Sequence, residues 1–157
     1  MLLAYRLVKL MEAHSEGLAR ALQAKVEKCD RCGGYRNVPQ EELRRLISEV
    51  YGHLGEWLLG KTEDDIKWRY MGIGARRAAQ GVPLSQVLWV ISMVKENLWE
   101  YLQENEVLER PAEVFGELEV LALLDQFFDR AMYYAARGYE NPQDAHTAEV
   151  LAGRVER

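Results

Sequence analysis

Cysteine, histidine and proline are scarce in this chain, and long apolar runs are missing. Its two cysteines stand in a single Cys29-x-x-Cys32 motif, which cannot form the disulfide framework on which small secreted domains depend. No uninterrupted apolar run approaches the roughly 20 residues of a membrane-spanning helix. The first residues also lack the basic region and the cleavage site of a signal peptide. We therefore expect a cytoplasmic protein without a membrane partner.

An excess of positive charge and the common catalytic motifs are absent as well. The formal net charge is −5 at pH 7, and no stripe of lysine and arginine follows a predicted helix, which argues against a nucleic-acid partner. The sequence holds no phosphate-binding glycine loop, hydrolase elbow, kinase signature or Ser-His-Asp pattern. We therefore expect that the protein is not an enzyme.

Helical periodicity is present over most of the sequence. Apolar residues recur every three or four positions in five segments, and none alternates as a strand does. The 157 residues fit one domain. We predict an all-α, single-domain antiparallel bundle of about five long helices, up-and-down or globin-like, over residues 1–140, with a polar tail over 141–157. The predicted helices span about 2–28, 39–60, 62–81, 83–105 and 112–138, and a short helix begins near Pro142.

The helix predicted over 112–138 carries apolar residues around most of its circumference. A helix of that kind has to be surrounded by other helices, so we expect it at the centre of the bundle. Pro111 stands where a first helical residue tolerates proline, and Gly138 stands where a glycine commonly ends a helix.

The third predicted helix carries local start and stop signals. Thr62 and Asp65 predict a capping box at its beginning. Gly81 is expected to end it. Within it, Gly72 and Gly74 predict either a weakened helix or a close crossing with another helix.

The Cys29-x-x-Cys32 motif admits three interpretations. It lies in a loop, as the following Gly33-Gly34 indicates. Zinc in a structural site needs four ligands, so zinc at Cys29 and Cys32 requires two further sulfurs, which a second chain could supply. A thioredoxin-like redox pair should open a helix after a strand, and no strand is predicted here. The third interpretation is a structural or incidental role.

Two histidines lie on or beside apolar helix faces. His14 is four residues from both Leu10 and Leu18, and His53 precedes Trp57 by four. An inward histidine in a helical bundle can ligate haem iron, whereas a core histidine more commonly bonds to a neighbouring group. The Glu-x-x-His pairs of di-iron bundles are absent. We expect no cofactor, with haem at His14 or His53 and zinc at the cysteines as alternatives.

Polar and aromatic residues of the middle helices are the candidates for a ligand pocket. They lie on or beside apolar faces, where pockets usually form. The structural alternative assigns the aromatic members to the core or to an interface, because aromatic side chains dominate burial in any bundle. The five candidates are His53, Trp57, Tyr70, Arg77 and Trp89.

Three stretches of the sequence together resemble one protein family. They are LGEWL at 54–58 with TEDDI at 62–66, RAAQGVPLS at 77–85, and FFDRAMYY at 127–134 with GYE at 138–140. These stretches resemble the N-terminal domain of RsbRD-type stressosome proteins, which are co-antagonists of the RsbT kinase. The resemblance extends over most of residues 10–140.

The resemblance implies an all-helical sensory module, related in broad shape to the non-haem globin-like domains of RsbR proteins. Such modules form dimers and relay a signal to an attached output domain, and similar domains precede sensor histidine kinases. No STAS or kinase domain follows residue 140 here, so we expect the output to pass through a separate partner or through self-association.

The leading hypothesis is therefore a non-catalytic, cytoplasmic regulatory domain. We expect it to form a homodimer and to signal through contacts with a partner kinase or a stressosome-type protein. One alternative is a metal- or haem-dependent redox or sensor protein that uses the cysteine loop or an inward histidine. Another is a plain assembly module whose helix faces bind a partner.

Overall fold

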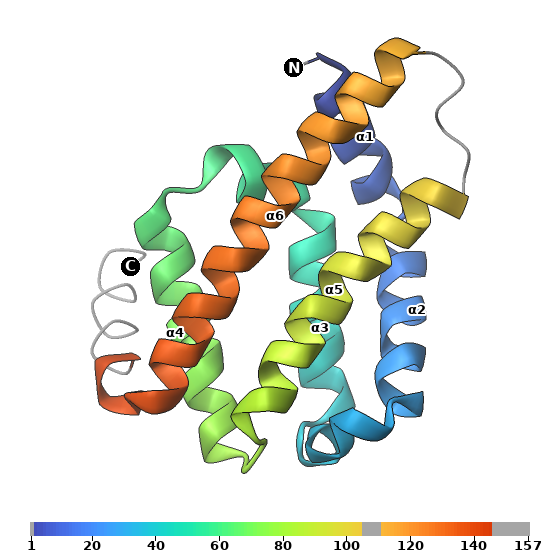
Figure 1. Ribbon diagram of the computed structural model, residues 1–157. Coiled ribbons are helices and arrows are strands. Elements are labelled where there is room, and N and C mark those ends of the chain that lie inside the picture. The colour runs from blue at the N-terminus through green and yellow to red at the C-terminus, as the bar shows by residue number, and fades with distance from the viewer. Residues whose placement is uncertain (1, 105–110, 146–157) are drawn as a thin grey trace.

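The computed structural model describes residues 2–104 and 111–145, with side chains from 4 to 104 and from 116 to 145. Within these ranges all the regular elements are helical and there is no strand, which confirms the all-α class. From α2 onward, each long helix runs opposite to the one before it (Figure 1). The elements are α1 (Leu2–Ala13), α2 (Ser15–Lys28), η1 (Asp30–Asn37), α3 (Gln40–Gly52), η2 (Glu56–Gly60), α4 (Glu63–Ala79), α5 (Leu84–Glu104) and α6 (Pro111–Glu140).

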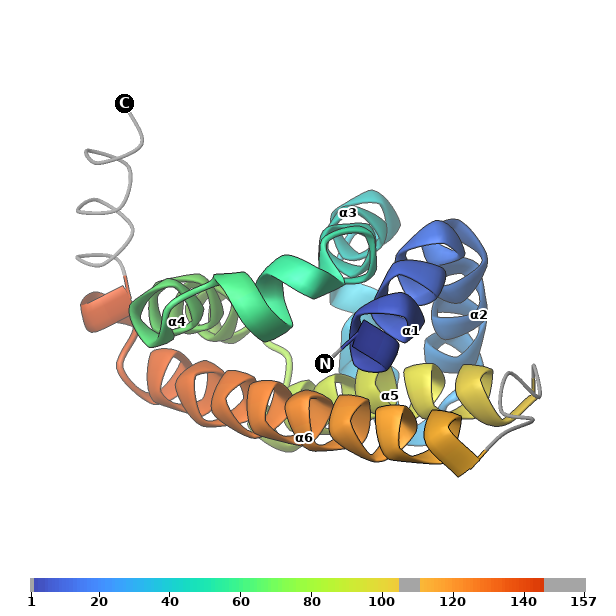
Figure 2. The ribbon, with the colours of Figure 1, turned by 90° about the horizontal axis from the view of Figure 1, so that it is seen from above.

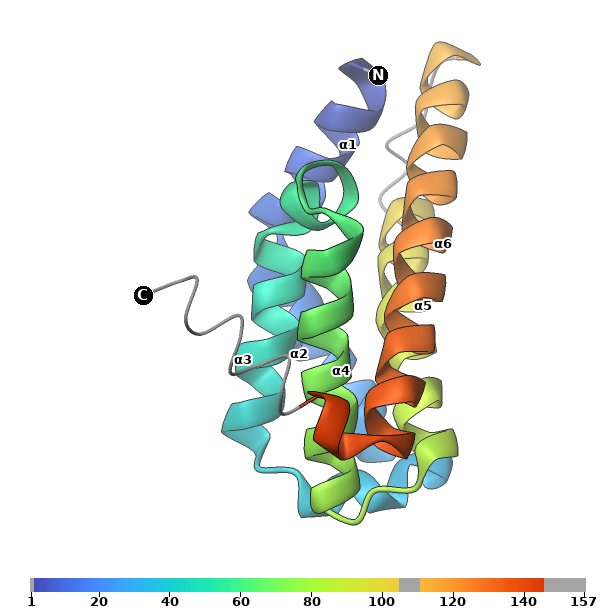
Figure 3. The same cartoon turned by 90° about the vertical axis from the view of Figure 1, so that its left-hand side faces the viewer.

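The helices form two layers. Helices α5 and α6 make up one layer, and α1 to α4 make up the other (Figures 2 and 3). Helix α6 packs along α4, α5 and α1, whereas α2 packs on α3 and α5. The η1 segment also lies against α5. Helix α5 therefore contacts α2, η1 and α4 of the opposite layer.

Two of the predicted long helices are broken. The segment predicted over 2–28 bends at His14, whose backbone angles leave the helical range, and becomes α1 and α2. The segment predicted over 39–60 ends at Gly52 and resumes as the short, wide turn η2. A hydrogen bond connects the regions of the two breaks: the Gly55 amide donates to the Glu12 carboxylate at 2.8 Å. The first bend lets α1 contact α6 while α2 contacts α3 and α5.

The local signals predicted for α4 are confirmed. The Asp65 amide donates to the Thr62 hydroxyl at 3.2 Å, and the Thr62 amide donates to the Asp65 carboxylate at 2.9 Å. This backbone hydrogen bond from Thr62 lowers the pKa of the Asp65 carboxyl below its ordinary value. After the end of α4, Gly81 adopts a φ of 73°, a left-handed conformation that glycine takes without strain.

A close crossing joins α4 to α6. A Cβ atom added at Gly74 would lie 1.9 Å from the Ala135 carbonyl oxygen, and one added at Gly138 would lie 2.0 Å from the Met71 carbonyl oxygen. The prediction of a close crossing at Gly74 is therefore confirmed. The prediction that Gly138 ends its helix is wrong, because α6 continues to Glu140 and this glycine admits the backbone of α4 instead.

Helix α6 is not the surrounded centre that its composition predicts. One side is covered, and its buried residues are Val120, Leu124, Phe127, Phe128, Ala131, Tyr134 and Ala135. The other side faces outward, where Leu118 is 55% exposed and Tyr133 is 58% exposed. A two-layer arrangement covers a helix from one side only, which is why the central position was wrongly predicted.

A buried polar cluster ties α2, α3 and α5 together. The Asn97 amide donates to the Leu18 carbonyl oxygen at 3.0 Å and to the Tyr51 hydroxyl at 3.1 Å. The Tyr51 hydroxyl in turn donates to the Val94 carbonyl oxygen at 2.9 Å. Burial raises the pKa of Tyr51, so the hydroxyl stays protonated as a donor.

The chain leaves α6 through a further helical turn over 142–145, where Ala145 is buried. This turn lies where the short tail helix was predicted to begin. The rest of that predicted tail, from residue 146 to residue 157, lies outside the described residues. The division of the chain at residue 140 stays a prediction.

Candidate functional site

Two of the five predicted pocket residues meet in the core. The rings of Trp57 and Tyr70 lie 5.8 Å apart between centroids, and both lie within 5.8 Å of Phe127. Trp57 comes from η2, Tyr70 from α4 and Phe127 from α6. All three are buried, so this part of the predicted pocket is filled by its own aromatic rings. Burial also raises the pKa of Tyr70.

The two histidines predicted to point inward are exposed. His14 caps α2, and its Nδ1 lies 2.9 Å from the Leu10 carbonyl oxygen. His53 follows α3, and its side chain is 62% exposed near Glu56. The expectation of an inward histidine is therefore wrong for both, because both sit at the bends where helices break. Haem at His14 or His53 stays a prediction.

Helix α4 places Arg77 in a polar cluster of which Arg77 itself is buried and Glu42 is half-buried. Its side chain is 2% exposed and donates to the Glu42 carboxylate at 3.0 Å and to the Gln80 amide oxygen at 2.8 Å. Arg76 also donates to Glu42. The hydrogen bond from Arg76, with those of Arg77, lowers the pKa of Glu42 to about 2. The guanidinium of Arg77 also lies over the Tyr35 ring, 5.8 Å from its centroid.

The cluster borders a shallow cleft of about 470 Å³ between α3 and α4. Four arginines and two glutamates line it. Arg76 and Arg77 pair with Glu42, and Arg69 pairs with Glu49. Sequence reasoning singled out Arg77 and missed Glu42 and Gln80. The spacing of Arg77 and Gln80, three positions apart at the end of α4, is a signal that could have indicated their contact. The charged residues lining the cleft are Glu41, Glu42, Arg45, Arg69, Arg76 and Arg77.

Trp89 lies on α5, away from the other four candidates. Its side chain is 42% exposed. The guanidinium of Arg31 stacks over its indole at 4.7 Å, a cation–π contact that holds η1 against α5. The five residues predicted as one pocket therefore occupy separate places, apart from the contact between Trp57 and Tyr70. Ligand binding by any of them stays a prediction.

The two cysteines lie at the junction of α2 and η1. Both are free thiols, and their sulfurs are 2.7 Å apart. Cys32 is buried and Cys29 is half-buried. The loop predicted there forms the tight turns of η1, with a kink at Cys32. Burial, together with the hydrogen bond between the sulfurs, raises the pKa of the Cys32 thiol to about 12.

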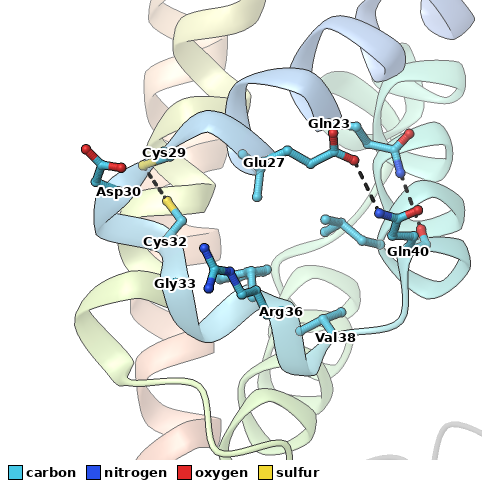
Figure 4. A pocket seen from close by; sticks show the side chains of 12 residues that line it. Gln23, Glu27, Cys29, Asp30, Cys32, Gly33, Arg36, Val38 and Gln40 are labelled. Atoms are coloured by element: carbon cyan, nitrogen blue, oxygen red, sulfur yellow. Dashed lines mark hydrogen bonds between the residues drawn. The ribbon is translucent and has the colours of Figure 1, made fainter.

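A pocket of about 380 Å³ opens beside the cysteines. Figure 4 shows the two sulfurs turned toward each other at one end of it, and Gln23, Glu27 and Gln40 joined by hydrogen bonds at the other. The pocket lies between α2, η1 and the start of α3. Its lining residues are Gln23, Val26, Glu27, Cys29, Asp30, Cys32, Gly33, Tyr35, Arg36, Val38, Gln40 and Leu43.

Glu27, Cys29, Asp30 and Cys32 line this pocket, but three or more of them are not placed to hold one metal ion. Over residues 2–104 and 111–145, no group of three or more His, Cys, Asp and Glu side chains is placed to hold a metal ion. Zinc at Cys29 and Cys32 therefore stays a prediction that requires ligands from elsewhere. In the same part of the chain, no helix combines the length and the apolar character that a membrane span requires.

The three sequence stretches that carry the family resemblance meet along α4 and α6. Trp57 of the first stretch packs on Phe127 of the third. Glu63 of the first accepts a 3.1 Å hydrogen bond from the Tyr134 hydroxyl of the third. The Tyr139 hydroxyl donates to the carbonyl oxygen of Val82, in the second stretch, at 2.6 Å. We call the contact of α4 with α6, from Glu63 to Gly74 and from Phe127 to Tyr139, the seam.

Comparison with known proteins points to one family. The family model described as the RsbT co-antagonist protein rsbRD N-terminal domain matches residues 12–153, which confirms the resemblance seen in the sequence. No curated protein and no solved structure matches the chain. The globin-like arrangement therefore stays a prediction.

Proposed function

This chain belongs to the family of RsbT co-antagonist protein rsbRD N-terminal domains, and from that premise we propose that it is a non-catalytic regulatory domain that relays a signal through protein–protein contacts. The family match over residues 12–153 is the observation that carries this proposal. The family description names RsbT. We propose that the domain is cytoplasmic and that its partner is an RsbT-type kinase or a stressosome-type protein.

We propose that the signal is relayed through the seam between α4 and α6. At Gly74 and Gly138 the backbones of α4 and α6 touch directly, so a small change in one helix displaces the other. A signal acts on such a contact only if it binds one packing state better than another. The seam runs to Tyr139, next to the point where the chain leaves α6. A shift there would be passed to whatever the domain contacts.

The outer face of α6 supports self-association. Leu118 and Tyr133 are large apolar side chains that stay exposed on α6, and a second copy of the domain that covers them would form one apolar interaction surface. Asp125 and Asp129 lie between them on the same side of the helix. We propose that two copies of the domain pair through this face, with Leu118 and Tyr133 as its apolar contacts.

Sedimentation velocity tests the pairing, and biolayer interferometry with a purified RsbT-type kinase tests the partner. We expect a dimer that binds the kinase. The double variant Leu118→Ser, Tyr133→Ser should weaken the dimer at least about tenfold, because buried interface anchors commonly contribute more than 1 kcal/mol each. Leu59→Ser is the matched control, because Leu59 is 48% exposed on η2 rather than on α6.

Two results would contradict the proposal. A chain that binds no RsbT-type kinase in any oligomeric state would remove the partner assignment. A dimer that survives the double variant unchanged, while Leu59→Ser disrupts it, would move the interface to the region of η2. Thermal unfolding of all the variants separates loss of binding from loss of fold.

A further inference from the structure

Three sulfur atoms from three elements come together beside η1. The Sγ atoms of Cys29 and Cys32 are 2.7 Å apart, and the Sγ of Cys32 lies 3.8 Å from the Sδ of Met93. Cys29 ends α2, Cys32 lies in η1 and Met93 lies in the middle of α5. Met93 is half-buried and packs against the core. The Cys32 sulfur is therefore close both to a second thiol and to a thioether.

The fold holds these sulfurs in place through backbone contacts. The Cys29 amide donates to the Val26 carbonyl oxygen, and the Cys32 amide donates to the Cys29 carbonyl oxygen at 3.1 Å. The Gly34 amide donates to the Gln86 side chain at 2.6 Å, which fastens η1 to α5. A Cβ atom added at Gly34 would lie 2.7 Å from the Cδ of Pro83, which cannot rotate away, so this approach depends on glycine. Helix α5 thus provides both the anchor of η1 and the third sulfur.

The pocket of about 380 Å³ is lined by both cysteines, of which Cys29 is half-buried and Cys32 is buried. Glu27 and Asp30 line it with exposed carboxylates, which attract a cation, and Arg36 lines it with a positive charge. Met93 is absent from the pocket lining and approaches Cys32 from the α5 side. An ion that enters from the pocket would meet the thiols first and the thioether behind them.

We propose that Cys29, Cys32 and Met93 form a binding site for a soft monovalent metal ion, Cu(I) or its redox-inert analogue Ag(I). Thiolate and thioether sulfur are the ligands that select Cu(I). Cu(I) and Ag(I) accept two or three sulfur ligands, whereas structural zinc requires four ligands. No third His, Cys, Asp or Glu side chain joins the cysteines among the described residues, so the ligand set fits the soft ion.

Binding releases protons and transfers no electrons. The ion joins the two cysteine sulfurs, both thiol protons leave to solvent, and the Met93 sulfur donates a lone pair without losing a proton. The bound site carries one negative charge. At neutral pH the ion has to displace the protons of both cysteine thiols, because sulfur binds the metal as thiolate. Affinity should therefore rise with pH, by up to about two log units per pH unit.

The first experiment titrates the full chain, reduced and under anaerobic conditions, with Cu(I) against a chromogenic Cu(I) chelator, and with Ag(I) in parallel. We expect one ion per chain, a thiolate-to-metal charge-transfer band in the ultraviolet, and protection of both thiols from a thiol reagent. The double variant Cys29→Ser, Cys32→Ser should lose all three signals. The proposal concerns binding alone and does not depend on the regulatory function.

The role of Met93 is tested by Met93→Leu, a change that nearly conserves volume and is tolerated in most cores. This variant should bind Cu(I) and Ag(I) at least about tenfold more weakly. Mutating a residue that only bonds to a metal ligand already lowers metal affinity by about this factor, and Met93 is proposed as a ligand itself. Met132→Leu on α6 is the matched control and should leave affinity unchanged. X-ray absorption at the copper edge should count three sulfur neighbours in the native protein and two in Met93→Leu.

Other outcomes would overturn the proposal. Absence of Cu(I) and Ag(I) binding by the reduced chain would remove the site, and affinity unaffected by Met93→Leu would remove the third ligand. Binding of zinc in preference to Cu(I), with two chains per ion, would instead support a zinc site shared between chains. Urea unfolding of each variant shows whether a lost signal reflects lost structure.

Discussion

The crossing of α4 and α6 at Gly74 allows one prediction to be worked through from distances. In Gly74→Ala, the new Cβ would lie 1.9 Å from the Ala135 carbonyl oxygen, 2.8 Å from its carbonyl carbon and 2.9 Å from the Tyr139 amide nitrogen. Real contacts of this kind are at least about 3 Å. The two helices must therefore separate by about 1 Å. The obstacle is backbone, so no side-chain rotation can relieve it.

Two opposing effects set the size of the change. Alanine in a helix is favoured over glycine by about 1 kcal/mol. Overpacking costs roughly 1–3 kcal/mol, and the upper end applies where backbone has to move. The free energy of unfolding should therefore fall by about 2 kcal/mol, which corresponds to a Tm lower by about 4–8 °C for a domain of this size.

Urea unfolding followed by far-ultraviolet circular dichroism measures this change. Gly17→Ala is the control, because a Cβ at Gly17 in α2 meets nothing within 4 Å and should stabilise by up to about 1 kcal/mol. Gly138→Ala should lower the free energy of unfolding as Gly74→Ala does. The double variant should lose less than the sum of the two single losses, because one separation of α4 from α6 relieves both clashes. A Gly74→Ala protein as stable as the native chain would refute the close crossing.

Other predictions concern the buried polar and aromatic groups. Glu42 has a pKa of about 2, below that of an unfolded glutamate, so it stabilises the fold above about pH 5 and loses this effect as the pH falls toward 2; Glu42→Gln should flatten this acid dependence of the urea midpoint. Tyr51→Phe removes the hydroxyl that donates to Val94 and accepts from Asn97, and equilibrium unfolding should show a loss of about 1–3 kcal/mol. Trp57→Ala should cost about 3–5 kcal/mol, because Trp57 is a packed core residue; thermal unfolding with little change in Tm would favour the pocket role instead.

Local signals in the sequence were sufficient wherever the interacting groups are neighbours in the chain. The capping box of Thr62 and Asp65 joins residues three positions apart, and it forms as predicted. The turn at Gly81 and the helix from Leu84 to Glu104 also follow from nearby residues. The helical periodicity of the apolar residues was enough to predict the all-α class, which the structure confirms.

Signals with two meanings could not be resolved from the sequence. A glycine late in a helix can end it or admit another backbone, and at Gly138 only the position of Met71 on α4 shows the second. A histidine among apolar residues can point inward or mark a bend. The breaks at His14 and His53 depend on contacts of α1 with α6 and of Glu12 with Gly55, which join distant parts of the chain.

The sequence by itself determined the class of the protein, the family to which it belongs and most helix boundaries, because these depend on composition, periodicity and short motifs. Only the tertiary structure decided which residues meet. It separated the five predicted pocket residues, and it brought Met93 to Cys32 across 61 positions of the chain. Helix spacing says which face a residue occupies, but packing in three dimensions decides what that face touches.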